Sequence, residues 1–343
     1  MPDVKDLNLE ELEDVFKKWG KPAFHAKQVF RWIYQRGLRD FLKMSDLSQD
    51  LREKLNKEFS VSSLDLVQCL ESSDGTKKLL FELSDKSVVE GVIIPVSDRV
   101  TGCVSSQVGC KFGCRFCASG LLGFKRNLSV SEIIDEILCI KDSSSENKLT
   151  HIVFMGTGEP LDNYENVLKA IRIINASYSL NIGARRITIS TSGFIPGIKK
   201  LQDENLQFEL SVSLHAADDK IRSSLMPINK KYPLKDLMKA VREYNAKTNR
   251  QITFEYVLIK GLNSDLQNAQ KLVTLLEGID CKVNLIPANP VKELGIEPPS
   301  KSEILIFQDF LKNAQVNVTL RKSRGEDIDA ACGQLRLRHV QKK

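Results

Sequence analysis

The sequence lacks any apolar run that approaches the ~20 residues a helix needs to cross a lipid bilayer. Its first residues, MPDVKDLNLEELEDVF, carry acids and bases throughout, unlike the apolar segment of a secretion signal. We therefore expect a cytoplasmic protein with no membrane partner. With 42% hydrophobic and 27% charged residues, the chain has enough apolar material for a full core, which argues against global disorder.

A large excess of one charge is also absent, because the formal net charge is only +6. The basic residues nevertheless fall in clusters: residues 17–39, Lys125 and Arg126, Arg185 and Arg186, residues 321–324, and the tail from residue 336. Such clusters attract phosphates, as in nucleic acids. A solvated basic face explains them equally well from composition alone.

The chain divides into segments of different character. Residues 1–57 have the pattern of short amphipathic helices with a break at 19–22, which predicts a small helical accessory domain. Residues 58–102 contain two apolar, β-branched runs at 79–83 and 88–96, which predict a β-hairpin. Residues 103–335 form the main domain, and residues 336–343 form a basic tail.

In the main domain, strand and helix patterns alternate. The strand candidates are residues 151–155, 187–191, 208–214, 252–259, 282–287 and 316–320, and the helix candidates are residues 131–141, 163–175, 233–247, 265–277 and 302–313. This alternation predicts a parallel sheet covered by helices, either a partial barrel or an open doubly wound sheet. In both cases, we expect the ligand at the carboxyl ends of the strands, where GTGEP, STSG, SLH and PANP occur.

Eight cysteines in a cytoplasmic chain are poorly explained as structural disulfides, so metal ligation or thiol chemistry is the better interpretation. Cys110, Cys114 and Cys117 form C-x3-C-x2-C directly after a strand-like run at 104–108. Soft thiolates at this density favour an iron–sulfur cluster or zinc. A structural zinc site usually has four protein ligands, and no second cysteine pair is evident. Three thiolates on a four-iron cluster would leave one iron open for a small molecule.

With Phe116 just before its last cysteine, this loop resembles the signature of the radical S-adenosylmethionine (SAM) enzymes. The resemblance covers nearly the whole chain and is closest to the RlmN family, through KPAFHAKQVFRWIYQRG, TGCVSSQVGCKFGCRFCASGLLGFKRNL, FMGTGEPLDNYENV, RRITISTSG, LMPINKKYPL, ITFEYVLIKG, NLIPANP and RGEDIDAACGQL. A sister family, Cfr, shares most of these motifs, but the valine of SSQVGC and the motifs ITFEYVLIKG and STSGFIPGI favour the RlmN family.

The resemblance implies a partial (β/α)6 radical SAM barrel, carrying an N-terminal helical domain and a β-hairpin extension. It implies a dual-specificity methyltransferase acting on C2 of an adenine in the peptidyl-transferase region of 23S rRNA and of an adenine in tRNA. The implied cofactors are a 4Fe-4S cluster on Cys110, Cys114 and Cys117, and SAM bound to its open iron. We expect 23S rRNA and tRNA as partners, an external flavodoxin-like electron donor, and a monomer, with residues 1–57 gripping the RNA.

The family's catalytic residues match three positions of this sequence. Cys332 would carry a methyl group received from a first SAM, and Cys103 would release the RNA product by forming a transient disulfide with it. Glu90 would be the proton acceptor at the adenine. From their sequence positions alone, Cys332 and Glu90 would be read as an ordinary buried cysteine and an ordinary strand carboxylate.

For SAM binding, the matched positions are Gly158, Glu159, Ser190, Ser213, Leu214, His215 and Asn289. Their strand-end location suits hydrogen bonds to the methionyl group and the ribose. Two residues depart from the family pattern: Thr157 replaces a Met, and Ala288 replaces an aromatic residue. The alternatives are C8 methylation of the same rRNA adenine and, remotely, a zinc-stabilised RNA-binding protein without catalysis.

Overall fold

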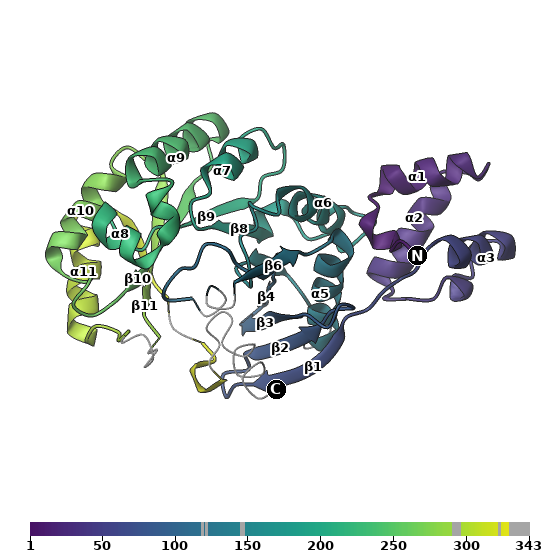
Figure 1. The fold of residues 1–343 in the computed structure, drawn as a ribbon, viewed down its shortest axis with the longest axis horizontal. Helices are drawn as coiled ribbons and strands as arrows, with labels where there is room; N and C mark the ends of the chain where they lie inside the picture. The colour runs from purple at the N-terminus through teal and green to yellow at the C-terminus, as the bar shows by residue number, and fades with distance from the viewer. Residues whose placement is uncertain (118–119, 121–122, 145–147, 290–295, 322–323, 329–343) are drawn as a thin grey trace.

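The computed structural model describes residues 1–117, 120, 123–144, 148–289, 296–321 and 324–328 of the chain. Figure 1 shows a curved sheet with helices along its outer side, and a separate group of short helices beside α5 (Val130–Ser143) and α6 (Tyr164–Asn175). Within the described residues, no helix combines the length and apolar character that crossing a membrane requires.

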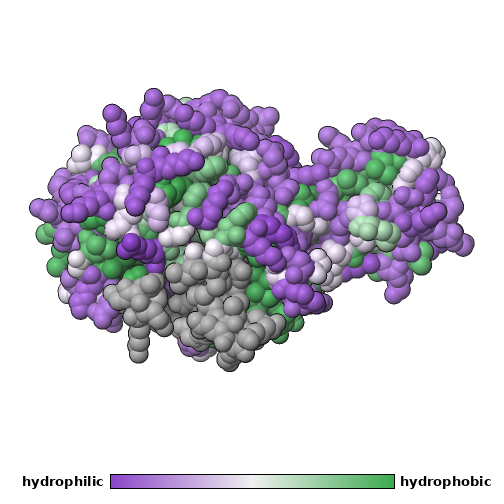
Figure 2. Space-filling model, in the orientation of Figure 1, coloured by the Kyte–Doolittle hydropathy of each residue, from purple (hydrophilic) through white to green (hydrophobic). Residues whose placement is uncertain are grey.

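The separate group at the N-terminus contains three α-helices, α1 (Leu9–Lys18), α2 (Phe24–Phe30) and α3 (Gln49–Glu58). A π-helical segment, η2 (Arg31–Gln35), continues α2. A capping box between Asn8 and Glu11 starts α1, so that two backbone donors of its first turn are satisfied. The predicted break at 19–22 separates α1 from α2. Figure 2 shows that the visible surface of these helices is mostly hydrophilic, with a few apolar residues between the polar ones.

The sheet has ten strands in the order β1-β2-β3-β4-β7-β8-β9-β10-β11-β12. Its first four strands are antiparallel: β1 (Asp65–Glu71), β2 (Lys77–Glu82), β3 (Val88–Val96) and β4 (Arg99–Cys103). The predicted hairpin is confirmed as β2 and β3. The sequence analysis missed β1, because almost all of its side chains are exposed and leave no apolar alternation to recognise.

From β4 onward the strands of this ten-stranded sheet are parallel: β7 (His151–Phe154), β8 (Ile187–Thr191), β9 (Glu209–Ser213), β10 (Ile252–Leu258), β11 (Cys281–Pro287) and β12 (Asn317–Leu320). The six strands expected after residue 150 are thus confirmed to within one residue at each end. Because β1 and β12 are the two ends of the strand order, the sheet stays open, as expected for a partial barrel.

The strand predicted at 104–108 is only partly correct. The chain leaves the sheet after Cys103 and resumes as β5 (Gln107–Gly109), which pairs with β6 (Phe124–Asn127) in a separate two-stranded sheet. Between them, the buried Ser105 N–H donates to both carboxylate oxygens of Glu136, at 3.0 and 3.1 Å, instead of to a neighbouring strand. This bend directs the chain into the cysteine loop.

The predicted helices are confirmed as α5, α6, α9 (Leu234–Thr248), α10 (Leu266–Leu276) and α11 (Lys301–Asn313). Two further helices were not predicted, namely α7 (Ile195–Leu201) and α8 (Asp219–Leu225). Each spans only seven residues, too few for a helical period to be recognised in the sequence.

Side chains alternate between the two faces of the parallel sheet. The outer face is apolar and contacts the helices; for example, Tyr256 of β10 lies 5.5 Å from Phe307 of α11, measured between ring centroids. The inner face carries polar residues at paired positions of neighbouring strands: Ser190, Ser211, Ser213, Thr253, Glu255 and Asn284. The helices therefore cover the apolar face, and the polar face is left for the interior of the partial barrel.

Buried charges attach the N-terminal segment to α5. Lys5 Nζ has no exposed surface and lies 3.1 Å from a carboxylate oxygen of Asp3 and 3.2 Å from one of Asp135. Asp6 Oδ1 accepts a hydrogen bond from the Ser131 N–H in the first turn of α5, at 2.8 Å. Burial raises the pKa of Asp135 to about 6, and Lys5 opposes this rise by favouring the ionised carboxylate.

Replacing Lys5 by Met should lower the free energy of unfolding by about 3–5 kcal/mol, because Asp3 and Asp135 would remain buried without their cation. Urea unfolding followed by circular dichroism measures this loss. Lys17→Met is the matched control, since Lys17 pairs with Asp14 on the exposed surface and should leave the midpoint unchanged. Equal midpoints for the two variants would contradict the structural role of Lys5.

Candidate active site

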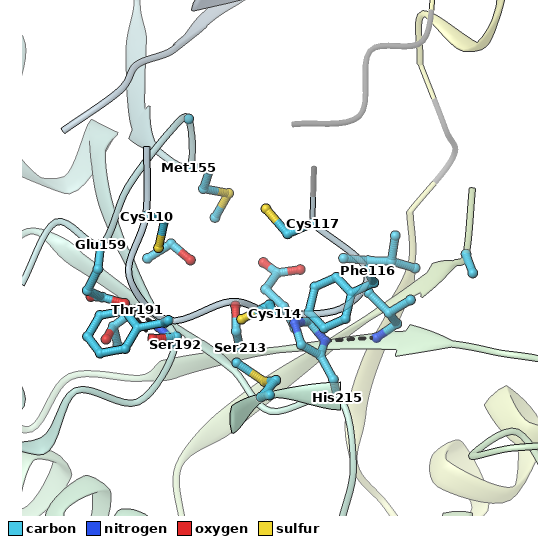
Figure 3. Close-up of a pocket in the computed structure, with 18 of the residues that line it drawn as sticks. Cys110, Cys114, Phe116, Cys117, Met155, Glu159, Thr191, Ser192, Ser213 and His215 are labelled. Atoms are coloured by element: carbon cyan, nitrogen blue, oxygen red, sulfur yellow. Dashed lines mark hydrogen bonds between the residues drawn. The ribbon is translucent and has the colours of Figure 1, made fainter. Parts of the chain in front are cut away.

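A cavity of about 320 Å³ opens at the carboxyl ends of the parallel strands, as the sequence predicts (Figure 3). Nine of the predicted site residues line it: Cys110, Cys114, Cys117, Gly158, Glu159, Ser190, Ser213, His215 and Asn289. Leu214 does not; its side chain is fully buried in the main apolar core. Cys332 lies outside the described residues.

The cysteine loop is fixed at both ends by backbone contacts. Gly109 has φ +76°, and a Cβ at this position would lie 1.8 Å from the Gly123 carbonyl oxygen, so only glycine fits. At the start of the loop, the Cys110 N–H donates to that carbonyl at 3.0 Å. In the middle, the Arg115 N–H donates to the Leu225 carbonyl at the end of α8, at 2.9 Å. These contacts hold the loop in the wall of the cavity.

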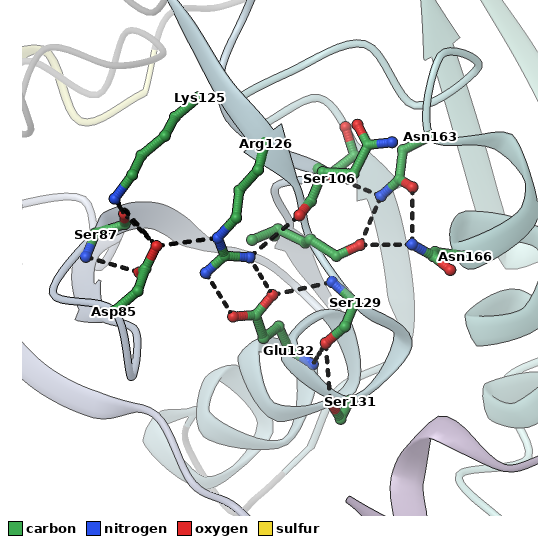
Figure 4. Close-up of polar contacts among 12 residues, drawn as sticks. Asp85, Ser87, Ser106, Lys125, Arg126, Ser129, Ser131, Glu132, Asn163 and Asn166 are labelled. Carbon is green, nitrogen blue, oxygen red and sulfur yellow. Dashed lines mark hydrogen bonds and ion pairs between the residues drawn. The ribbon is translucent and has the colours of Figure 1, made fainter. Parts of the chain in front are cut away.

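The strand that leaves the loop is anchored by Arg126, as Figure 4 shows. Its guanidinium donates to both carboxylate oxygens of Glu132, at 2.7 and 2.8 Å, and to Asp85 Oδ2 at 3.0 Å. Glu132 also forms the capping box of α5 with Ser129. Lys125 pairs with Asp85 as well. Lys125 and Arg126 are therefore engaged in ion pairs that hold the fold. They have a structural role, and are neither a free phosphate-binding patch nor a merely solvated face.

Two thiols of the loop, those of Cys110 and Cys114, are poor anions in the protein alone. Burial raises the pKa of Cys110 to about 12, and it raises the pKa of Cys114 further. The other thiols of the loop act in the same direction, because like charges disfavour ionisation. Thiolates form here only when cations such as iron offset the burial, so binding of a metal group must release protons.

The donor set fits a 4Fe-4S cluster better than a single metal ion. Among the described residues, no group of three His, Cys, Asp or Glu side chains is close enough together to hold one ion. In a four-iron cluster each thiolate binds a different iron, so the three sulfur atoms stand further apart than the ligands of one zinc. Cys110, Cys114 and Cys117 around a common cavity fit this arrangement, and they would leave one iron of a bound cluster open to a ligand.

Glu159 places a buried carboxylate on the cavity wall. Its Oε2 accepts hydrogen bonds from the backbone N–H and the hydroxyl of Ser192, both at 2.7 Å, and its Oε1 accepts from the Leu161 N–H at 3.2 Å. Burial raises the pKa of Glu159, while the hydrogen bonds from Ser192 act in the opposite direction. Next to it, Gly158 has φ +105°, and a Cβ would lie 2.5 Å from the Gln107 side chain. Only glycine therefore fits where this turn packs against Gln107.

His215 is held in a strained conformation against the cysteine loop. Its φ of +58° lies in the left-handed region, and its ring is in edge-on contact with Phe116, at 4.7 Å between centroids. The Val257 N–H donates to His215 Nδ1 at 3.1 Å. Since Nδ1 accepts, a neutral ring carries its proton on Nε2, which is then a hydrogen-bond donor.

Sequence reasoning did not single out the polar network on the inner face beneath the cavity. Glu255 Oε1 accepts from the Ser211 hydroxyl and from the Asn284 amide, each at 3.0 Å, and Arg321 Nη1 lies 3.6 Å from Glu255 Oε2. Glu255 and Arg321 both line the cavity. The signal that could have identified Glu255 is its position in ITFEYVL, where a carboxylate interrupts an otherwise apolar strand and must face a polar environment.

Glu90 and Cys103 lie outside the cavity lining, on the neighbouring strands β3 and β4. Glu90 is buried, and its Oε1 is 3.8 Å from Nζ of the fully buried Lys78. Cys103 is buried and pairs in register with Val92, two residues after Glu90. Since residues two apart on a strand share a face, Glu90 and Cys103 lie on the same face of the sheet.

The described residues do not support the disulfide bond that the resemblance implies. No disulfide links the seven cysteines that the structure describes, and Cys332 lies outside them. A bond that forms only during a reaction would leave no link in the resting protein. The two departures from the family pattern lie at the site: Thr157 is buried, with an Oγ1 that has no hydrogen-bond partner among the described residues, and Ala288 is a buried part of the cavity wall.

We expect the His215 ring to stay neutral between about pH 5 and 8. Burial lowers its pKa from 6.5 to about 3. Below about pH 6.5 the His215 ring binds a proton in the unfolded chain but not in the folded protein. The contribution of His215 to the free energy of unfolding is therefore complete above that pH and is lost as the pH falls. NMR of the protein labelled with 15N-histidine measures the ring, with His215→Gln to assign its signals. A ring that titrates near pH 6.5 would contradict this prediction.

Comparison with known proteins bears on the two parts of the chain separately. A family profile described as the radical SAM superfamily matches residues 104–273. A second profile, described as the ribosomal RNA large subunit methyltransferase N-terminal domain, matches residues 3–61. Superfamily membership implies a 4Fe-4S cluster and SAM as cofactors, which agrees with the donor set of the cavity.

Full-length relatives join the two parts in one protein. A relative from Caldanaerobacter subterraneus subsp. tengcongensis, named probable dual-specificity RNA methyltransferase RlmN, is 47% identical over 99% of both chains. A relative of the same name from Staphylococcus aureus is 44% identical over 98% of this chain and 93% of its own. The crystal structure of a radical SAM methyltransferase from Sphaerobacter thermophilus is 42% identical, with a TM-score of 0.92 over 97% of this chain and 99% of its own. The chain therefore belongs to the RlmN family of radical SAM RNA methyltransferases.

Proposed function

We propose that this protein methylates C2 of adenine in 23S rRNA and in tRNA, with SAM as both methyl donor and radical source. The cavity is the observation that supports this most strongly, because the thiols of the loop and the strand-end polar residues face a common space (Figure 3). Adenine C2 lies between two ring nitrogens and is too electron-poor to attack the methyl group of SAM by displacement. The cluster with its bound SAM would supply the radical that this carbon requires.

In this proposal Cys110, Cys114 and Cys117 hold the cluster, and the strand ends hold SAM. Glu159 would accept a hydrogen bond from the SAM amino group, since its oxygens retain lone pairs beyond those used by Ser192 and Leu161. The other groups proposed to bind SAM are the backbone at Gly158 and Leu214, the side chains of Ser190, Ser213 and Asn289, and the Nε2–H of His215.

Two cysteines would act before and after bond formation to the RNA. The Cys332 thiolate would accept a methyl group by ordinary displacement from a first SAM. After hydrogen abstraction, the carbon on this sulfur would bond to C2 and join the protein to the RNA. The Cys103 thiolate would then attack the Cys332 sulfur, so that a disulfide forms, the bond from that sulfur to the transferred carbon breaks, and this carbon takes up a proton as the methyl group of the product. Its place on a strand next to the one that carries Glu90 supports this role.

Glu90 would take the proton that C2 loses. Lys78 Nζ lies 3.8 Å from its Oε1, and both side chains are shielded from water, as a site that excludes solvent from a proton transfer requires. Such a pair, placed on the same face as Cys103, brings the proposed base and the proposed releasing thiol toward the same substrate. The polar inner face of the sheet offers hydrogen-bonding groups to the base that enters.

We propose four domains. Residues 1–57 bind RNA, residues 58–102 carry Glu90, residues 103–335 perform the radical chemistry, and residues 336–343 form a basic tail. The first domain presents basic residues over half-buried aromatic rings: Arg36 lies 4.0 Å from the centre of the Trp32 ring, and Lys54 lies 4.7 Å from that of Trp19. Such surfaces bind phosphates and unstacked bases. A monomer that receives electrons from a flavodoxin-like donor completes the proposal.

Nucleoside analysis tests the reaction. Anaerobically purified protein, incubated with a reductant, methyl-labelled SAM and unmodified rRNA or tRNA, should yield labelled 2-methyladenosine after digestion of the RNA. Labelled 8-methyladenosine would instead support the C8 alternative. Protein that retains a full complement of iron and sulfide but yields no methylated adenosine from either RNA would overturn the proposal.

The two cysteine variants should fail at different stages. Cys332→Ala should form neither methylated adenine nor a covalent adduct, because no sulfur carries the methyl group. Cys103→Ala should accumulate protein joined to RNA, visible on a denaturing gel as a shifted band that nuclease treatment collapses. Cys281→Ala is the matched control, since Cys281 lies at the opposite end of β11 from the cavity. Efficient turnover by Cys103→Ala, or an adduct with Cys332→Ala, would refute the respective role.

A further inference from the structure

Arg222 of α8 is a cation with no exposed surface, placed directly behind the cavity wall. Its Nη2 donates to the carbonyl oxygens of Ser192, at 2.8 Å, and Ser213, at 3.2 Å, and its Nε donates to the Leu214 carbonyl at 3.1 Å. Its Nη1 donates to Asn229 Oδ1 at 2.7 Å. The guanidinium thus ties together the ends of β8 and β9, the two strands that contribute Ser190 and Ser213 to the cavity.

All four acceptors of Arg222 are neutral. None of the ion pairs in the described part of the chain includes this residue, and the nearby carboxylate of Asp219 is used instead by the Asn229 amide and the Leu234 N–H. Burial lowers the pKa of Arg222 to about 10, which still leaves it charged at neutral pH. A fully buried cation without a carboxylate in contact is costly, and negative charge placed close to it would reduce that cost.

The cysteine loop packs against the end of α8, the helix that carries Arg222. Cys114 packs in the same apolar cluster as Leu225, the last residue of α8, and Met226, which follows it. The Arg115 N–H donates to the Leu225 carbonyl. A negative charge on Cys114 would raise the pKa of Arg222, and so does the charge of Asp219, to a smaller extent. Three thiolates give a bound 4Fe-4S cluster a net negative charge, and reduction adds one more.

We propose that Arg222 is the buried counter-cation of the cluster, and that its charge raises the cluster's reduction potential. This inference rests on the proposed assignment of the cluster to Cys110, Cys114 and Cys117. Arg222 does not line the cavity, and its donors are already occupied by protein acceptors, so it acts on the cluster through its charge and not by contact with SAM. Arg222 also has a positioning role, because its planar guanidinium fixes the strand ends that would hold SAM.

The test is a potentiometric titration of the anaerobically prepared holoenzyme, followed by electron paramagnetic resonance of the reduced cluster. Arg222→Gln removes the charge, and Arg222→Lys keeps the charge but loses the fork. We expect Arg222→Gln to disfavour reduction by tenfold or more, which for a one-electron couple is a shift of about 59 mV to lower potential. Arg222→Lys should keep a potential near that of the unmodified protein but bind SAM more weakly.

Arg250→Gln is the matched control, because it removes a partly buried arginine just before β10, at the end of the sheet opposite the cavity, and should not change the potential. An unchanged potential in Arg222→Gln, with full iron and sulfide, would overturn the inference and leave the proposed function intact. Loss of the cluster in both Arg222→Gln and Arg222→Lys would also overturn it, since the fork and not the charge would then be essential. Unmodified protein that assembles no cluster would overturn the proposed function itself.

Discussion

The alternation of polar and apolar side chains along the parallel strands is the constraint on which the rest of the structure depends. Each strand turns one face to the helices and the other to the interior, so a slip of one residue would exchange the two environments. The interior is consequently polar, and its groups need partners: Glu255 finds them in Ser211 and Asn284 across three neighbouring strands. An open sheet with such a lining suits a polar ligand and cannot serve as a dry core.

Much of this fold was predictable because its signals are local. The strands from β7 to β12 are short apolar runs between polar loops, and the helices of eleven or more residues show a clear period. The bend after Cys103 could not be read from the sequence, because the partner of the Ser105 N–H is Glu136, 31 residues further along the chain. The strand β1 was missed for a related reason, since its exposed side chains carry no pattern.

The site also contains residues that the sequence predicts and contacts that it does not. The cysteine loop and the strand-end motifs are recognisable from residue type and spacing, and the structure brings nine of the predicted residues to one cavity. The contacts that hold these residues in place have no such signature. Arg126 looked like part of a phosphate-binding cluster, but it joins the β2–β3 turn to the start of α5, and Arg222 stood out only once its neutral acceptors were known.

The attachment of the first helices to α5 has a consequence for synthesis on the ribosome. Asp6 accepts a hydrogen bond from Ser131 in the first turn of α5, 125 residues later in the chain. At about 5–20 residues per second, roughly 6–25 s pass between the emergence of these two partners. During that interval Lys5 and its carboxylates remain in water, and the N-terminal helices have no surface on which to dock. A nascent chain that terminates before α5 would therefore release this segment without its docking surface, as a substrate for proteolysis.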